Sequence, residues 1–126
     1  MGRPYVLGTG ECCHRAAEVW RERFGIDVEV EAVHGDLHRA HRMIEARLAG
    51  SDWHSVQVPR EGDAVLMRKG HLVCHIGVWV APSHVLHCTK AHGMVLTPVD
   101  GLASLGFHLV GCFRKAVDHG ELALAA

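Results

Sequence analysis

Three residues far apart in the chain have the types that cysteine-based nucleophilic chemistry needs: Cys12, His75 and His87. A cysteine attacks a carbonyl carbon as its thiolate, and a histidine can take the thiol proton and return it to the leaving group. A second polar group must hold that first imidazole in position. The sequence therefore predicts Cys12 as nucleophile, His75 as general base and His87 as the residue that orients His75, a chemistry that needs no cofactor.

The residues after Cys12 predict the helix that must position it, over residues 12–24. Apolar residues recur there at helical spacing, and they form one stripe made of Cys13, Ala16, Ala17, Trp20 and Phe24. Gly25 follows as a stop. A helix N-terminus carries partial positive charge, so we expect the pKa of the Cys12 thiol to fall to about 3.5–7.5.

The remaining elements follow from a second helical stretch and a later change of period. Asp36 and Gly50 can begin and end a helix over residues 36–49. After Pro59, short runs rich in Val, Leu and Ile predict strands over 63–68, 73–80, 84–88, 94–97 and 109–114. Helices followed by strands predict an α+β fold, in which one helix, carrying Cys12, packs on an antiparallel sheet.

The turn at residues 81–83 decides whether the two histidines can meet. A three-residue turn places His87 opposite Gly77, as a diagonal neighbour of His75 on the same face of the sheet. A two-residue turn would place His87 opposite Val78, on the other face. The sequence leaves the turn length open, and the predicted histidine pair depends on the longer turn.

Composition narrows the classes of protein. The 126 residues suit a single domain over residues 1–126, and we expect a flexible tail over 116–126. A net charge of −1 gives no electrostatic case for nucleic-acid binding. No apolar run is long enough for a membrane span, and we expect no signal peptide. The five cysteines are an odd number, and we expect all of them to be reduced at synthesis.

Other uses of the same residue types remain open. Zinc-compatible side chains occur in two groups, Cys12, Cys13, His14, His87 and Cys88, and His34, His38 and His41. Neither a Cys-x-x-Cys pair nor a His-Glu-x-x-His stretch is present, so we expect no metal. Asp63 fits a turn or strand end better than a catalytic role.

The motifs around these residues resemble those of the NlpC-type cell-wall peptidases, a papain-like family, and most of all its phage tail-assembly protein K branch. Residues 4–8 read Pro-Tyr-Val-Leu-Gly, and residues 20–26 read Trp-Arg-Glu-Arg-Phe-Gly-Ile. Residues 59–67 read Pro-Arg-Glu-Gly-Asp-Ala-Val-Leu-Met, 75–80 read His-Ile-Gly-Val-Trp-Val, and 85–87 read Val-Leu-His. The resemblance covers residues 4–26 and 59–115, and it implies the papain-like fold and the catalytic roles of Cys12, His75 and His87.

The chain departs from the family pattern beside the nucleophile. Glu11 stands where the family usually has Asp, and Cys13 follows Cys12 as a rival nucleophile. We favour Cys12, because it keeps the family's spacing to residues 20–22 and because Cys13 belongs to the apolar stripe. The resemblance implies that backbone N–H groups at the helix start, that of Cys13 among them, hold the oxyanion, and that the Tyr5 hydroxyl faces the site and helps bind the oxyanion or the substrate.

The resemblance also implies a reaction and a setting. The reaction is hydrolysis of amide bonds in the stem peptides of peptidoglycan. The setting is the tail tip of a phage virion, with other tail-tip proteins as partners and synthesis in the host cytoplasm without a signal peptide. A tail-tip subunit that keeps the fold and has lost activity is the alternative. Residues 27–58 resemble nothing in the family.

Overall fold

The computed structural model describes residues 2–116, which form two helices followed by six strands. The helices are α1 (Cys12–Phe24) and α2 (Leu37–Ala49). The strands are β1 (Trp53–Val56), β2 (Ala64–Lys69), β3 (Leu72–Val80), β4 (His84–Thr89), β5 (Gly93–Pro98) and β6 (His108–Lys115). Two 3₁₀ turns, Val99–Gly101 and Ala103–Leu105, connect β5 to β6. Both predicted helices and all five predicted strands are present, with bounds shifted by at most one residue.

Both helices begin and end for the expected local reasons. The Asp36 carboxylate accepts hydrogen bonds from the backbone N–H groups of His38 and Arg39, at 3.0 and 3.1 Å, and so caps α2. Gly25 ends α1 in the left-handed region, with φ of 64°, which a residue with a side chain rarely adopts. The start of α1 is unusual, because the His14 imidazole accepts the backbone N–H of Glu11 at 3.2 Å.

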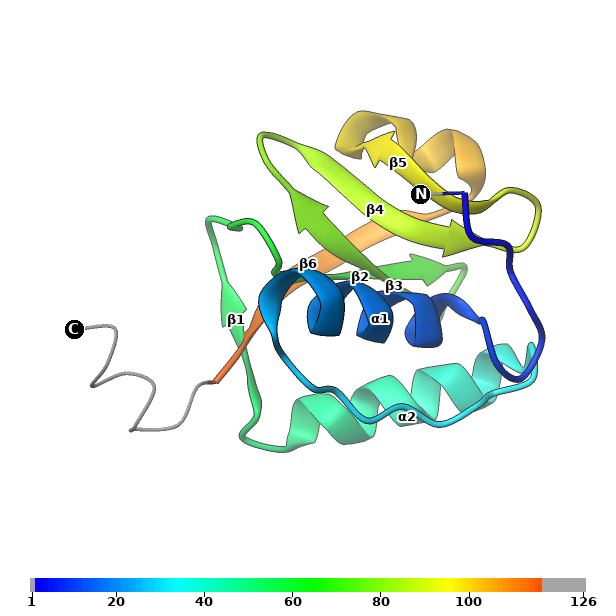
Figure 1. Cartoon of the computed structure of the whole chain (residues 1–126), viewed down its shortest axis with the longest axis horizontal. Coiled ribbons are helices and arrows are strands. Elements are labelled where there is room, and N and C mark those ends of the chain that lie inside the picture. The colour runs from blue at the N-terminus through cyan, green and yellow to red at the C-terminus, as the bar shows by residue number, and fades with distance from the viewer. Residues whose placement is uncertain (1, 117–126) are drawn as a thin grey trace.

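The strands form one antiparallel sheet in the order β1-β6-β2-β3-β4-β5, which confirms the predicted α+β class (Figure 1). Strand β1 was not predicted from the sequence. It has only four residues, and its two central ones, His54 and Ser55, are exposed. It pairs with β6, which lies about 60 positions later in the chain, so the local pattern of apolar residues does not indicate a strand there.

Two helices, rather than the single predicted one, cover one face of the sheet (Figure 1). Helix α1 packs on β3 and β4, and α2 packs on β3 and β1. The α1 stripe buries Ala16 and Trp20 against Ala64 and Val78 of the sheet. The Trp20 indole also donates to the Gly62 carbonyl at 2.7 Å. These contacts fix where α1 begins, and therefore where Cys12 lies.

The other face of the sheet has a second core, closed by the segment between β5 and β6. Met67, Trp79 and Val85 pack there with Leu102, and Phe107 packs against the same cluster. The predicted role of Asp63 as a strand-end residue is confirmed. It lies just before β2, and its carboxylate binds the Arg114 guanidinium at 2.7 and 2.8 Å.

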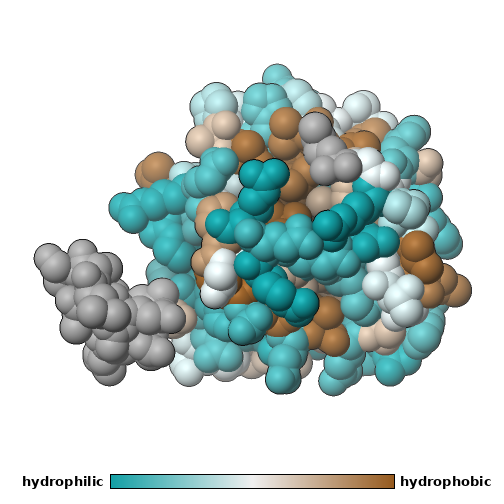
Figure 2. Space-filling view, viewed as in Figure 1, coloured by the Kyte–Doolittle hydropathy of each residue, from teal (hydrophilic) through white to brown (hydrophobic). Residues whose placement is uncertain are grey.

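The outer surface of this fold is mixed in character. Figure 2 shows hydrophilic side chains over much of the face that carries the two helices, with apolar atoms visible between them. Within residues 2–116, no helix combines the length and the apolar character needed to cross a bilayer. The predicted tail at 116–126 lies, apart from its first residue, outside the described residues.

Candidate active site

The two strands that carry the histidines separate beside the start of α1. In the pairing of β3 with β4, Val80 lies opposite His84 and Gly77 lies opposite His87. This is the register that the three-residue turn predicts. Beyond that last pair, β3 and β4 continue without pairing to each other. Cys12 lies at this opening, where its Sγ donates to the Cys74 carbonyl of β3 at 4.0 Å.

A cavity of about 200 Å³ occupies the opening and brings the predicted residues to one place. Its wall contains Cys12 from the first turn of α1, His75 from β3 and Tyr5 from the N-terminal segment. Within residues 2–116, no hydrogen bond joins the Cys12 sulfur to the His75 ring, and the thiol donates to the Cys74 carbonyl. That contact is at the outer limit for a sulfur donor, so the thiol can rotate away from it at small cost.

The two histidines form a direct hydrogen bond inside the sheet. Nε2 of His75 lies 2.8 Å from Nδ1 of His87, and Nε2 of His87 lies 2.8 Å from Oγ1 of Thr97. His75 is 6% exposed and His87 only 1% exposed. Because Nε2 of His75 is engaged by His87, Nδ1 is the ring nitrogen left to face a reacting group.

Packing holds both rings in this arrangement. The Phe107 ring stacks on His75, with centroids 4.1 Å apart and planes inclined by 12°. Gly77 lies opposite His87, where an added Cβ would lie 3.1 Å from the His87 Cβ and 2.4 Å from a Val85 methyl. Glycine at position 77 therefore makes the room that the second imidazole occupies.

Burial keeps both imidazoles neutral. It lowers the pKa of His75 to about 3, with smaller contributions from His87 and from the charge of Lys69. It also lowers the pKa of His87 to about 4. A neutral imidazole can accept a proton at the ring nitrogen that carries no hydrogen, so His75 can act as a general base when that nitrogen is Nδ1.

The expected thiolate at Cys12 is wrong for the resting structure. Burial raises the pKa of the Cys12 thiol to about 12, and the neighbouring Cys13 adds to the increase. The backbone N–H groups of Ile76 and Cys13 oppose it only in part. Loss of hydration therefore outweighs the helix N-terminus, and thiol and imidazole are both neutral near pH 7.

The Cys13 side chain points away from this cavity, which removes it as a rival nucleophile. It is 1% exposed, and its thiol donates to the Glu31 carbonyl at 3.7 Å. It lines a separate apolar cavity of about 50 Å³ between the helices and the sheet, with Trp20 and Ile44. Only its backbone N–H faces the Cys12 sulfur, as the resemblance implies for an oxyanion donor.

Tyr5 lies in the cavity wall, but its hydroxyl does not point to an oxyanion site. It donates to the Glu11 carboxylate at 3.2 Å, so the proton expected to stabilise the oxyanion is already used. The same carboxylate accepts the backbone N–H groups of Val33 and Gly35, at 2.9 and 2.7 Å. Burial alone would raise the pKa of Glu11, but these donors outweigh it and lower that pKa.

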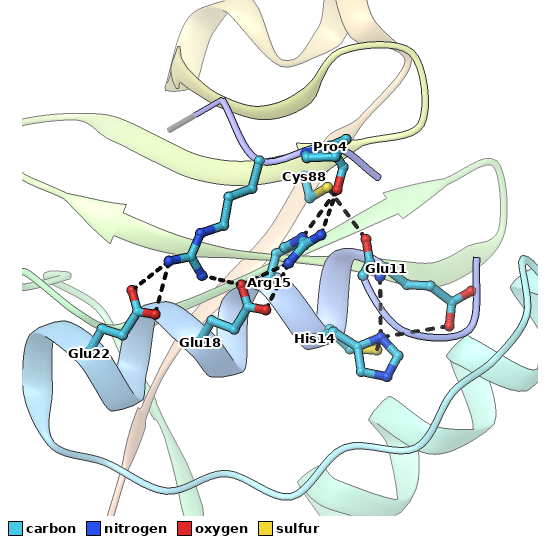
Figure 3. A network of polar contacts seen from close by, with 10 residues as sticks. Pro4, Glu11, His14, Arg15, Glu18, Glu22 and Cys88 are labelled. Carbon is cyan, nitrogen blue, oxygen red and sulfur yellow. Dashed lines mark hydrogen bonds and ion pairs between the residues drawn. The ribbon is translucent and has the colours of Figure 1, made fainter. Parts of the chain in front are cut away.

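Arg15 ties the N-terminal segment to α1 (Figure 3). Its guanidinium donates to the Pro4 carbonyl at 2.9 and 3.2 Å and to Glu18 at 2.8 and 3.0 Å. The Cys88 thiol reaches the same segment by donating to the Gly10 carbonyl at 3.9 Å. These contacts hold Tyr5 over the start of α1, at the edge of the cavity.

Four further residues at the site were not predicted from the sequence: Thr97, Phe107, Lys69 and Lys90. The position of Thr97 could have been predicted from the sequence. If the predicted strand 94–97 pairs with the strand that carries His87, the Thr97 side chain lies on the same face of the sheet as His87. Phe107 comes from a connecting segment, and no sequence period places it. Lys69 and Lys90 are exposed and line the cavity beside His75.

One group of possible metal ligands exists within the described residues, and it shares only Cys13 and His14 with the zinc-compatible groups noted in the sequence. Ligand atoms of Glu11, Cys13 and His14 lie within 4.8 Å of one another. The Glu11 oxygens and Nδ1 of His14 already have hydrogen-bond partners, since Glu11 accepts two backbone N–H groups and His14 Nδ1 accepts a third. This donor set does not fit a metal ion without breaking those bonds.

No protein-family model matches the chain, and no curated protein matches it.

Proposed function

We propose that the protein is a cysteine peptidase or amidase of the NlpC type, with Cys12 as nucleophile and His75 as general base. One observation carries the proposal: the Cys12 thiol and the His75 ring line one cavity, while a second buried imidazole fixes the His75 ring at 2.8 Å. The cavity and the hydrogen bond join residues from α1, β3 and β4, which a merely structural cysteine would not require.

The first half-reaction follows from the neutral state of both groups. As the Cys12 sulfur attacks the scissile carbonyl carbon, its proton passes to Nδ1 of His75 and a C–S bond forms. In this proposal the backbone N–H groups near the sulfur, those of Cys13 and Ile76, bind the developing oxyanion. The imidazolium then gives its proton to the leaving nitrogen as the C–N bond breaks.

The second half-reaction releases the acyl group. His75, neutral again, takes a proton from a water molecule while the water oxygen attacks the thioester carbonyl. The C–S bond breaks, and the proton returns from His75 to the Cys12 sulfur. The products are a carboxylic acid and an amine, and the free enzyme is restored without a cofactor.

The charge around the cavity suits a peptide that carries carboxylates, as the stem peptides of peptidoglycan do. Lys69 and Lys90 line the cavity and are exposed, whereas the Glu11 carboxylate there is buried, and backbone N–H groups compensate its negative charge. A local positive charge on a chain of net charge −1 favours anionic ligands. We take stem peptides as the substrate and the tail tip of a virion, with other tail proteins, as the setting.

The test is digestion of purified peptidoglycan, with the soluble fragments identified by mass. Wild-type protein should release fragments with a new amine and a new carboxylate, and Cys12→Ala should release none. Cys112→Ala removes a buried thiol from the core on the other face of the sheet and should retain activity. Equal release by wild type and Cys12→Ala, or none by wild type, would refute the proposal.

One observation favours the alternative of an inactive tail-tip subunit. The Cys12 thiol has a pKa of about 12, so the resting site holds no thiolate. Purified virions that contain Cys12→Ala distinguish the two functions. A structural subunit predicts normal assembly and infection by these virions, whereas an enzyme predicts normal assembly with impaired entry through the wall.

A further inference from the structure

Thr97 ends the chain of hydrogen bonds that begins at His75. It lies on β5, where its backbone pairs with Val85 of β4, so its side chain shares a face with His87 two residues along. Its Oγ1 lies 2.8 Å from Nε2 of His87, and the residue is 9% exposed. Among residues 2–116, Thr97 Oγ1 makes no side-chain hydrogen bond except that to His87.

The direction of this chain determines what His75 can do. In one direction, Nε2–H of His75 donates to Nδ1 of His87, and Nε2–H of His87 donates to the Thr97 hydroxyl. Nδ1 of His75 is then unprotonated and can accept the Cys12 proton. In the other direction, the Thr97 hydroxyl donates to His87, His87 donates to His75, and Nδ1 of His75 carries a hydrogen. Both directions use two neutral imidazoles, but only the first makes His75 a base.

We propose that Thr97 is a positioning residue that accepts the Nε2–H of His87 and so leaves Nδ1 of His75 free to take the Cys12 proton. This inference rests on the proposed function of the site. The Nε2–H tautomer is the intrinsically favoured form of a neutral histidine side chain, and this direction puts both rings in that form. A hydroxyl can accept at this position while staying neutral, so no carboxylate is needed to hold the pair.

The chain must also carry the charge that forms during the reaction. When His75 gains the thiol proton, both of its ring nitrogens become donors. Nδ1 of His87 can accept from Nε2 of His75 only while the proton of His87 stays on Nε2, where Thr97 binds it. Loss of the hydroxyl leaves that buried N–H without a partner and makes the opposite tautomer of His87 competitive.

The first test reads the tautomers directly and needs no activity. Nitrogen-15 chemical shifts of the imidazole rings in wild-type protein, near pH 7, identify which nitrogen of each ring carries the hydrogen. We expect His75 and His87 both as Nε2–H tautomers. A Nδ1–H tautomer at His75 would overturn the inference, whether or not the protein cleaves peptidoglycan.

The second test asks whether Thr97 sets this state. Thr97→Val keeps the shape of the side chain and removes the hydroxyl, and Thr97→Ser keeps the hydroxyl. We expect Thr97→Val to shift His87 toward Nδ1–H and to lower kcat on stem peptides by about 10- to 100-fold, which is less than the full contribution of about 10²- to 10⁴-fold that a positioned base makes. Thr97→Ser should recover wild-type shifts and at least a third of the wild-type kcat.

Two results separate the possible failures. If Thr97→Val keeps wild-type tautomers and kcat, the role of Thr97 is refuted while the proposed function stands. If wild-type protein shows the expected tautomers but cleaves nothing, the proposed function fails while the hydrogen-bond direction stands. If Thr97→Val does not fold, the wild-type shifts and the Thr97→Ser variant still decide the direction.

Discussion

Cys12 and Cys13 are consecutive residues of the same type at the same helix N-terminus, yet they enter opposite environments. Cys12 lines a cavity that also contains an imidazole and two lysines, where β3 and β4 separate. Cys13 lines an apolar cavity between the two helices and the sheet. Burial raises the pKa of both thiols, to about 12 and about 11. What distinguishes them is therefore the neighbouring base, since neither thiol is activated by its pKa.

The largest expected effect contrasts the two cysteines with one substitution. Cys12→Ser replaces the sulfur by a weaker nucleophile and should lower kcat by about three orders of magnitude or more, as removal of a nucleophile usually does. Cys13→Ser buries a hydroxyl in an apolar cavity and should instead cost about 1–3 kcal/mol of unfolding free energy.

Kinetics on stem peptides and urea unfolding measure the two effects of these variants. Similar losses of kcat in both would mean that the two thiols are not functionally distinct, and the comparison would fail.

The next effect concerns His87. His87→Ala leaves Nε2 of His75 buried without its partner, so we expect kcat to fall by about 10²-fold, because the base loses its orientation. His84→Ala is the matched control, since His84 lies on the same strand, is partly exposed and pairs with Val80, at the far end of β3 from His75. Steady-state kinetics compare the variants, and equal activity of His87→Ala and wild type would contradict the orienting role.

A third effect is the pH dependence of stability. His75 and His87 titrate near 3 and 4 in the folded protein, against about 6.5 in an unfolded chain. Between these values the unfolded state binds more protons, so stability is complete above pH 6.5 and is lost as the pH falls. At pH 5 we expect each histidine to lower the free energy of unfolding by up to about 2 kcal/mol. Each pH unit below 6.5 changes the folding equilibrium by a factor of ten, which corresponds to about 1.4 kcal/mol.

Urea unfolding at pH 7 and pH 5 measures this loss. The His87→Gln variant removes one of the two buried imidazoles and should show a weaker pH dependence. The same dependence in wild type and His87→Gln would show that His87 does not stay neutral in the folded protein.

The smallest expected effect comes from the lysines of the cavity. Lys69→Gln and Lys90→Gln should each raise KM for a carboxylate-bearing stem peptide by about two- to fivefold, as for an exposed ion pair, with little change for its amidated form. Lys115→Gln is the control, because its ammonium binds the Asp27 carbonyl and does not line the cavity. Equal KM changes for the acid and the amide would mean that charge does not select the substrate.

Local patterns predicted the parts of the site that lie within one element or one turn. The stripe from Cys13 to Phe24 predicted the helix. Of the two turn lengths that the sequence left open at 81–83, the three-residue turn predicted His87 opposite Gly77, as the structure has it. In that register the two imidazoles were expected within reach of each other, and the structure has them in a direct hydrogen bond. These features depend on contacts between near neighbours in the chain or across one hairpin.

What the sequence did not predict depends on distant segments and on burial. Phe107 reaches His75 from the connection between β5 and β6, and the Tyr5 hydroxyl binds Glu11. The helix N-terminus suggested an acidic thiol at Cys12, but the magnitude of desolvation depends on the walls that the rest of the chain builds.

The most direct test of a nucleophilic Cys12 beside His75 is to trap the thioester. Wild-type protein is mixed with excess stem peptide, quenched in acid within one turnover and digested, and the peptide that carries residues 12 and 13 is sequenced by mass spectrometry. The account predicts the acyl group of the substrate on Cys12, and its absence when His75→Ala is used. An acyl group on Cys13, or product formation with no acyl group on either cysteine, would contradict it.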